Sequence, residues 1–411
     1  MRTETKRDAL VFAAFAIIVL FLIQSYSLHW DEGAFLQNAE TFIGDTANTE
    51  PGRPFLLSLL IAQVWRFTGE STEAARAVVL LFGLATIGVF YLISKKESRD
   101  YFPLFAAFAF APLLLFWSFR VYTDVPGLFF VLASLYAYKK NRHIESGLFI
   151  ALATIMRIAY GAFGVGALLA YIIQRDRNVR LYIIGGLMGL AVEFLYGAAV
   201  YGDPLGHIYA YISDHALARQ GFDPLGTVAM NAGWLLVTSF ALLPGAAAGW
   251  KKAPLNERLM LVSYAVFILA TSALAFSRYW LPAIPLLLLM NYRAIDRDSF
   301  ILVAGSTIII TAAIVGGEFA LQAACDPPFR EAIEYVKNSE DPVAVGDNWA
   351  VAGYLLDTKI YAPWAPYETL RNEHGVTYVI SPEALPYTLE RTFSNSCVTY
   401  YVYNLRSPDP T

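Results

Sequence analysis

The chain has 411 residues, of which 57% are apolar and only 16% carry a charge, and its mean hydropathy is +0.47. This composition lies outside the usual range of soluble domains and favours a membrane protein. The net charge is −4, and the polar tail from about residue 320 holds twelve acidic and six basic residues. Nucleic acid is therefore not an expected partner.

Eleven apolar stretches predict about eleven transmembrane helices. The first, Ala9 to Ser25, follows three basic residues and precedes no small-residue cleavage site, so we expect a membrane anchor rather than a signal peptide. Several later stretches are shorter than the ~20 residues that cross a bilayer, and we expect them to meet around a polar cavity. They cover 72–94, 101–117, 124–138, 144–156, 160–174, 181–200, 226–249, 257–275, 279–292 and 299–317.

The first connecting loop is predicted to contain two interfacial helices, Glu32–Ile43 and Phe55–Phe67. The first places its apolar residues on one helical face, which suits the membrane surface. A crossing by the second would reverse the sidedness of every later loop. With both at the interface, 17 Lys and Arg residues fall on the side of the N-terminus and seven on the other side before the tail. The excess predicts a cytoplasmic N-terminus, a multi-pass protein of the cell membrane and an extracytoplasmic tail.

The tail predicts a small α/β domain over residues 320–411, after a transmembrane domain over residues 1–319. Helix-like runs (329–337, 349–356, 367–373) alternate in it with strand-like runs (342–345, 358–361, 376–380, 400–404). Both cysteines of the chain, Cys325 and Cys397, lie in this domain. They are either a disulfide that joins its two ends or two buried free thiols.

Ionisable residues of the predicted membrane domain gather at the outer ends of helices. A transporter favours such groups near the middle of the bilayer. Here only Glu193 lies well within a helix, and it is expected in the outer half of that helix. Carboxylates beside arginines suit group transfer from a lipid phosphate, because guanidinium groups pair with phosphate oxygens and a carboxylate accepts a proton. The residues are Asp31, Glu32, Arg53, Arg120, Asp124, Arg157 and Arg278.

Five short segments, in their order and spacing, resemble the membrane glycosyltransferases of the C superfamily. The likeness covers the whole chain and is greatest to the protein O-mannosyltransferase (dolichyl-phosphate-mannose) and aminoarabinose transferase branch. The segments are Trp30–Gly33, Gly52–Phe55, Glu73–Arg76, Tyr122–Pro126 and Arg278–Pro282.

This resemblance implies an inverting glycosyltransferase that moves a sugar from a polyprenyl phosphate to an acceptor hydroxyl on a protein, lipid or glycan. Asp31 matches the family's catalytic base and Glu32 the acid that follows it. Arg53 matches a residue that contacts the lipid phosphate, and Arg278 matches the arginine of the Arg-Tyr-x-x-Pro run. Phe55 departs from the family, which has a second proline there, and the first loop is compact.

Arg157 interrupts an apolar hairpin, so we assign it to the donor phosphate as well. Asp124, Arg120 and Tyr279 are expected to line the cavity. The carboxylates have an alternative role as an N-cap or first-turn acid of a helix, and Arg53 and Arg278 have an alternative role as anchors at the membrane interface.

No cofactor is expected. His207, Tyr211 and His215 repeat every fourth residue and offer a metal site, but an amphipathic surface helix explains them more simply. The rival function is a lipid or solute transporter, which requires a charge-lined path to the inner face.

Overall fold

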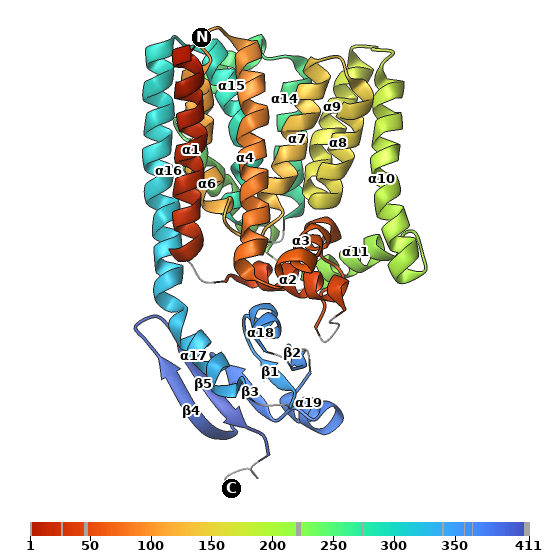
Figure 1. Ribbon diagram of the computed structural model, residues 1–411, viewed down its shortest axis with the longest axis vertical. Coiled ribbons are helices and arrows are strands. Elements are labelled where there is room, and N and C mark those ends of the chain that lie inside the picture. Colours follow the sequence, from red (N-terminus) through yellow and green to blue (C-terminus); the bar gives the residue numbers. More distant parts are fainter. Residues whose placement is uncertain are drawn as a thin grey trace. The chain divides into compact units, whose positions relative to one another are not determined.

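The computed structural model describes residues 2–25, 28–44, 48–218, 223–272, 274–338, 341–356, 358–363 and 365–406. The protein is 74% helical, and its described residues form one five-stranded sheet near the C-terminus (Figure 1). Its contacts divide the chain into two compact units. Unit 1 comprises 1–24, 54–57 and 76–316, and unit 2 comprises 25–53, 58–75 and 317–411.

Unit 1 is a bundle whose long helices run side by side (Figure 1). In chain order its helices are α1 (Arg2–Ser25), α4 (Thr72–Glu97), α5 (Phe102–Ala109), α6 (Pro112–Trp117), α7 (Asp124–Lys139), α8 (His143–Met156), η1 (Ile158–Tyr160), α9 (Gly161–Ile173), α10 (Val179–Tyr201), α11 (Gly206–Ala218), α12 (Pro224–Ser239), α13 (Leu242–Gly249), η2 (Trp250–Lys252), α14 (Leu255–Thr271), η3 (Ser277–Ala283), α15 (Ile284–Ala294) and most of α16 (Arg297–Cys325).

Several helices of this unit turn large apolar side chains outward. Phe21 is 72% exposed, Leu195 70% and Ile309 71%, and such faces suit lipid rather than water. Three helical segments of the described residues (Thr72–Glu97, Val179–Tyr201 and Arg297–Val336) are long and apolar enough to cross a membrane, and a bent pair raises the number to four. The protein is therefore built for a membrane, and the figure of eleven spans stays a prediction.

Two of the predicted apolar stretches are each broken into two helices. Residues 101–117 form α5 and α6, and Pro112 opens the second of these. Residues 226–249 form α12 and α13, which meet at 89°. Pro244 lies four residues after Phe240, and a proline there removes a helical hydrogen bond and crowds the carbonyl of residue 240. Pro112 thus explains the break between α5 and α6, and Pro244 the break between α12 and α13.

Four buried or half-buried ionisable residues form a closed set of ion pairs, which we call the ion-pair ring. Lys139 at the end of α7 contacts Glu97 at 2.6 Å and Glu257 at 2.8 Å. Arg293 on α15 contacts the same two carboxylates at 2.7 and 2.5 Å. Because each cation meets both acids, the ring joins α4, α7, α14 and α15.

Unit 2 contains the predicted α/β domain. Its sheet has the order β2-β1-β3-β5-β4, in which β1 is parallel to β2 and β3, and β5 is antiparallel to β3 and β4. All three residues of β1 are buried and apolar, as in a strand covered on both faces. The elements are α17 (Pro327–Val336), β1 (Val343–Val345), α18 (Trp349–Leu355), β2 (Ile360–Tyr361), α19 (Tyr367–His374), β3 (Tyr378–Ser381), β4 (Thr388–Ser394) and β5 (Thr399–Asn404).

Unit 2 also holds most of the first loop. The two helices predicted there form as α2 (Trp30–Ile43) and α3 (Phe55–Thr68), although their interfacial position stays a prediction. All three helices and all four strands predicted in the tail are present within a few residues of their expected bounds. The strand β4 was not predicted. It lies at the edge of the sheet and is mostly exposed, so its alternation of apolar residues is weak.

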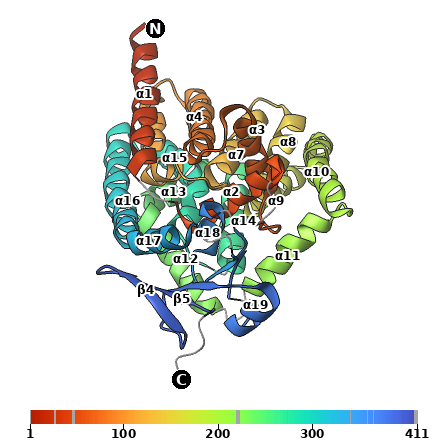
Figure 2. The same cartoon turned by 60° about the horizontal axis from the view of Figure 1, so that its bottom comes forward.

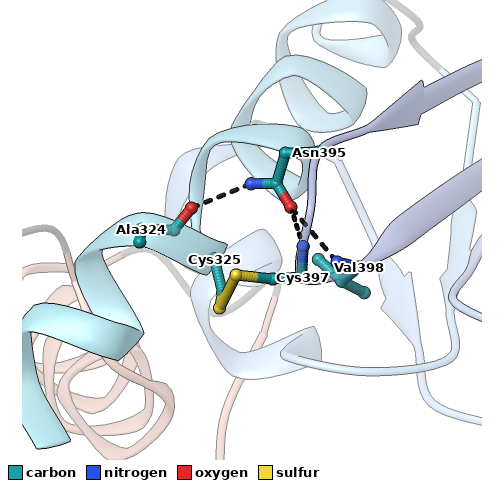
Figure 3. The surroundings of a disulfide bond; sticks show 5 residues. All are labelled: Ala324, Cys325, Asn395, Cys397 and Val398. Atoms are coloured by element: carbon teal, nitrogen blue, oxygen red, sulfur yellow. Dashed lines mark hydrogen bonds between the residues drawn. A yellow bond between two sulfur atoms is a disulfide. The ribbon is translucent and has the colours of Figure 1, made fainter.

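A disulfide joins Cys325 at the end of α16 to Cys397 in the turn between β4 and β5 (Figure 3), which settles the open alternative. Asn395 supports the turn by accepting hydrogen bonds from the backbone N–H groups of Cys397 and Val398 and donating one to the carbonyl of Ala324. The cysteines are 72 residues apart. Closing a loop of that length stabilises a fold by about 4 kcal/mol through the entropy of the unfolded chain.

Candidate functional site

In unit 1, predicted site residues meet where the start of α7 approaches the end of α8. Asp124 is fully buried at the first turn of α7, and its Oδ2 accepts a hydrogen bond from Nη1 of Arg157 at 3.0 Å. Arg157 caps α8 in an extended conformation, and η1 follows directly. The Tyr160 hydroxyl donates to the carbonyl of Asp124 at 3.0 Å. A Cβ on Gly127 would lie 2.6 Å from the Tyr160 ring, so a glycine is required for this approach.

Arg278 joins this group from η3. Its guanidinium carbon lies 4.3 Å from the ring centre of Tyr122 and 5.8 Å from that of Tyr279. Arg157 lies 5.3 Å from the same Tyr279 ring. Tyr279 therefore stands near both arginines, at cation–π distances. We call Asp124, Arg157, Tyr160, Arg278 and Tyr279 the arginine cluster.

Other side chains around the Arg278 guanidinium group are aromatic. The rings of Phe276 and Trp117 lie 4.6 and 5.3 Å from its guanidinium carbon, and the Arg278 side chain is only slightly exposed. The Tyr264 hydroxyl donates to the Tyr279 carbonyl at 2.6 Å, which fixes the backbone beside Arg278. Charged groups held in such low-polarity surroundings interact strongly with a ligand of opposite charge.

Arg157 and Asp124 of this cluster retain hydrogen-bonding capacity. Within the part of the chain that the structure describes, Nε of Arg157 and Oδ1 of Asp124 are buried and make no hydrogen bond to protein. Arg120, also expected in the cavity, is buried in the segment between α6 and α7, and its guanidinium carbon lies 5.3 Å from the ring of Phe119.

An apolar groove of about 470 Å³ begins one residue after Arg157. It runs between α9 and α14 and has almost no polar surface. A hydrocarbon chain fits such a groove by its chemistry. The lining residues are Ile158, Gly161, Ala162, Val165, Ser263, Val266, Phe267, Ala270 and Thr271.

In unit 2, the predicted residues of the first loop form a second group, the first-loop cluster, made of Asp31, Glu32, Glu50 and Arg53. Arg53 contacts Asp31 through Nη1 at 3.1 Å and Glu50 through Nε at 3.0 Å. The Asp31 side chain is 19% exposed and that of Arg53 30%. The pair is therefore partly open to solvent, and the Asp31 carboxylate stands beside a positive charge.

Glu32 occupies a different position from its neighbour. Its side chain is fully buried, and its Oε2 accepts a hydrogen bond from the backbone N–H of His29 at 2.9 Å. This bond is half of a capping box at the start of α2. Glu32 thereby fixes the start of the helix on which Asp31 stands.

No group of three or more His, Cys, Asp or Glu suited to a metal ion occurs among the described residues. The histidine candidate in α11 is only partly described, because the side chain of His215 lies outside the described residues. His207 instead pairs with Glu193 at 2.5 Å.

Sequence reasoning missed Tyr160 and Glu50. Each had a local signal: Tyr160 lies three residues after Arg157, and Glu50 lies three residues before Arg53, a spacing that suits an ion pair. The rings of Tyr122 and Trp117 near Arg278 had no such signal, since they come from other segments of the chain.

The described helices and these two clusters belong to a helical membrane protein with a small C-terminal α/β domain. No protein-family model and no curated protein sequence matches the chain. Solved structures do match it over nearly its full length.

The chain is similar to ArnT from Cupriavidus metallidurans bound to undecaprenyl phosphate, with a TM-score of 0.67, 13% identity and coverage of 97% of this chain and 98% of that one. It matches the apo form of the same protein with a TM-score of 0.68, 14% identity and coverage of 98% of both chains. The resemblance to the aminoarabinose transferase branch is thus confirmed for the fold.

Proposed function

We propose that this protein is an inverting glycosyltransferase that moves a sugar from a polyprenyl phosphate to an acceptor hydroxyl at the outer face of the cell membrane. The observation that carries the proposal is the arginine cluster. It brings two guanidinium groups, one of them paired with Asp124, to the same Tyr279 ring, and an apolar groove begins at the residue after Arg157. A lipid phosphate has the matching chemistry, an anionic head on a hydrocarbon chain.

In this mechanism Arg157 and Arg278 bind the donor phosphate, and the groove between α9 and α14 receives the first part of its lipid. Cations held in place stabilise the charge that develops on the departing phosphate, and each such donor is commonly worth about 3–4 kcal/mol. Tyr160 and Asp124 hold Arg157 in position.

Asp31 is the general base, and Glu32 sets the geometry of that base. The Asp31 carboxylate takes the proton from the acceptor hydroxyl, and the acceptor oxygen attacks the anomeric carbon from the face opposite the phosphate. The bond from the anomeric carbon to the phosphate oxygen breaks, and polyprenyl phosphate leaves with the electron pair. The configuration at the anomeric carbon is therefore inverted.

Arg53 acts at the first step of the reaction, when the donor binds. It contacts Asp31 before the reaction, and a donor phosphate competes with that carboxylate for the guanidinium group. Transfer of Arg53 to the phosphate frees Asp31 to act as a base.

The proposed orientation places unit 2 outside the cell. The disulfide between Cys325 and Cys397 supports it, because disulfides persist in oxidising compartments. The fold neighbours favour an undecaprenyl carrier, since one of them is bound to undecaprenyl phosphate, and nothing in them favours dolichyl-phosphate mannose.

A transporter requires a polar path through the bundle. The ion-pair ring argues against it, because its four charges are all engaged with one another across four helices. We therefore prefer the transferase.

The test is release of labelled sugar from synthetic undecaprenyl-phosphate aminoarabinose, glucose and mannose by the purified protein with an acceptor extract. We expect one donor to be consumed, and Asp31→Asn to lower its turnover by about 10²–10⁴. The melting temperature of this variant should change little, since the Asp31 side chain is partly exposed. Full activity of Asp31→Asn would overturn the mechanism. If the native protein neither binds nor turns over any of the three donors, the proposed function is wrong.

A further inference from the structure

The C-terminal domain makes a specific set of contacts with α2, the helix that carries Asp31. Figure 2 shows α18 beside α2, and the two helices pack closely along their length. Both belong to unit 2. The contact combines small residues, buried polar side chains and aromatic rings.

Glycines allow the two helices to approach. A Cβ on Gly33 of α2 would lie 2.4 Å from the carbonyl oxygen of Ala350 in α18. A Cβ on Gly353 would lie 1.9 Å from Nε2 of Gln37. A larger residue at position 33 meets the backbone of α18 and forces the two helices apart, whereas a larger residue at position 353 displaces the Gln37 side chain.

Two amide side chains then fix the register. Gln37 is buried on α2, and its Nε2 donates to the carbonyl of Ala350 at 2.7 Å. Asn48 donates from Nδ2 to the carbonyls of Gly353 at 3.2 Å and Thr358 at 3.0 Å, and its Oδ1 accepts from the N–H of Ile360 at 3.0 Å. Asn48 therefore spans α18 and β2 with both of its donors and its acceptor.

Aromatic contacts complete the attachment. Trp30, next to Asp31, packs edge-on against Trp349 at 4.2 Å between ring centres. Trp65 of α3 stacks on Tyr354 of α18 at 6.4 Å. Burial raises the pKa of Tyr354 to about 12, so its hydroxyl stays protonated at neutral pH and keeps its hydrogen bond with Thr72.

We propose that the C-terminal domain is a positioning element for the catalytic base and that Gln37 and Asn48 are its positioning residues. The catalytic part of this inference rests on the proposed function of Asp31. Side chain to backbone hydrogen bonds fix both the distance and the register of α2, whereas apolar packing alone permits sliding. A shift of about 1 Å in a reacting group costs a transferase on the order of a hundredfold in rate.

The experiment compares Gln37→Met, Asn48→Ala and the double variant with native protein. Methionine conserves the volume of Gln37 but cannot donate to Ala350. The matched control is Asn404→Ala, because Asn404 bonds to Glu390 of the neighbouring strand and to the backbone of Arg406 instead of the first loop. Two quantities are measured: turnover per donor-binding site, and amide hydrogen exchange across α2.

We expect the double variant to lose about tenfold to a hundredfold in turnover per site, with donor affinity within about twofold of native and faster exchange across α2. The control should match the native protein in both measurements. Native turnover per site in the double variant would overturn the inference, and so would unchanged exchange. If the native protein turns over no donor, the proposed function fails separately, and the exchange measurement alone decides whether the domain holds α2.

Discussion

The two ends of α7 carry ionisable clusters of opposite design. Asp124 begins the helix within the arginine cluster, and Lys139 ends it within the ion-pair ring, about 24 Å away along 16 residues. The ring has two carboxylates and two cations, and each cation meets both acids. The arginine cluster has one carboxylate, paired with Arg157, and a second guanidinium group, Arg278, near the same Tyr279 ring.

This difference separates a structural role from a binding role. In the ion-pair ring every charge is paired with opposite charges, so the ring joins helices but has no excess charge to attract a charged ligand. A cluster with excess positive charge attracts an anion, and the aromatic rings around Arg278 keep water from screening it. The same kinds of residue thus serve stability at one end of the bundle and, in our proposal, donor binding at the other.

Of the variants at the two ends of α7, Arg278→Gln should lower turnover most. Removal of one positioned cation should lower turnover by about 10²–10³, because the charge on the leaving phosphate loses a partner in the transition state. The measurement is kcat with saturating donor, with Arg371→Gln in the exposed helix α19 as a control. A kcat equal to native would remove Arg278 from the mechanism.

At the other end, Glu257→Gln should act on stability instead. The substitution removes the buried carboxylate that pairs with Lys139 and Arg293. Breaking such a buried ion pair lowers the free energy of unfolding by about 3–5 kcal/mol. We expect a lower denaturation midpoint in detergent and nearly native turnover per folded molecule. Normal stability combined with lost activity would assign this ring to catalysis and contradict the division between the two ends.

The smallest effect is expected from Tyr160→Phe. The variant loses only the hydrogen bond from the hydroxyl to the carbonyl of Asp124, worth about 1 kcal/mol. Turnover should fall by less than about tenfold while the fold is kept. A larger loss, measured as kcat/KM, would indicate that the hydroxyl touches the donor directly.

Sequence reasoning located the ends of the helices where charge gathers, because a charge in an apolar hairpin, such as Arg157, stands out against its surroundings. It also identified the elements of the α/β domain from their alternation. It could not pair Asp124 with Arg157, since this contact depends on the close approach of Gly127 to Tyr160, which no periodicity encodes.

The ion-pair ring was hidden for a related reason. In the sequence, Lys139 and Arg293 belong to the general excess of basic residues on the side of the membrane that holds the N-terminus. That excess carries no information on their ion-pair partners. The disulfide stayed open because a separation of 72 residues does not show proximity. The edge strand β4 escaped notice because polar residues such as Glu390 and Arg391 interrupt its pattern.

Equilibrium binding of undecaprenyl phosphate shows directly whether the arginine cluster binds the lipid phosphate. Arg157→Gln and Arg293→Gln each remove an arginine from an ion pair in unit 1, one at each end of the bundle. We expect Arg157→Gln to weaken binding by about tenfold or more, whereas Arg293→Gln should bind like the native protein. Native affinity in Arg157→Gln, or an equal loss in both variants, would contradict it.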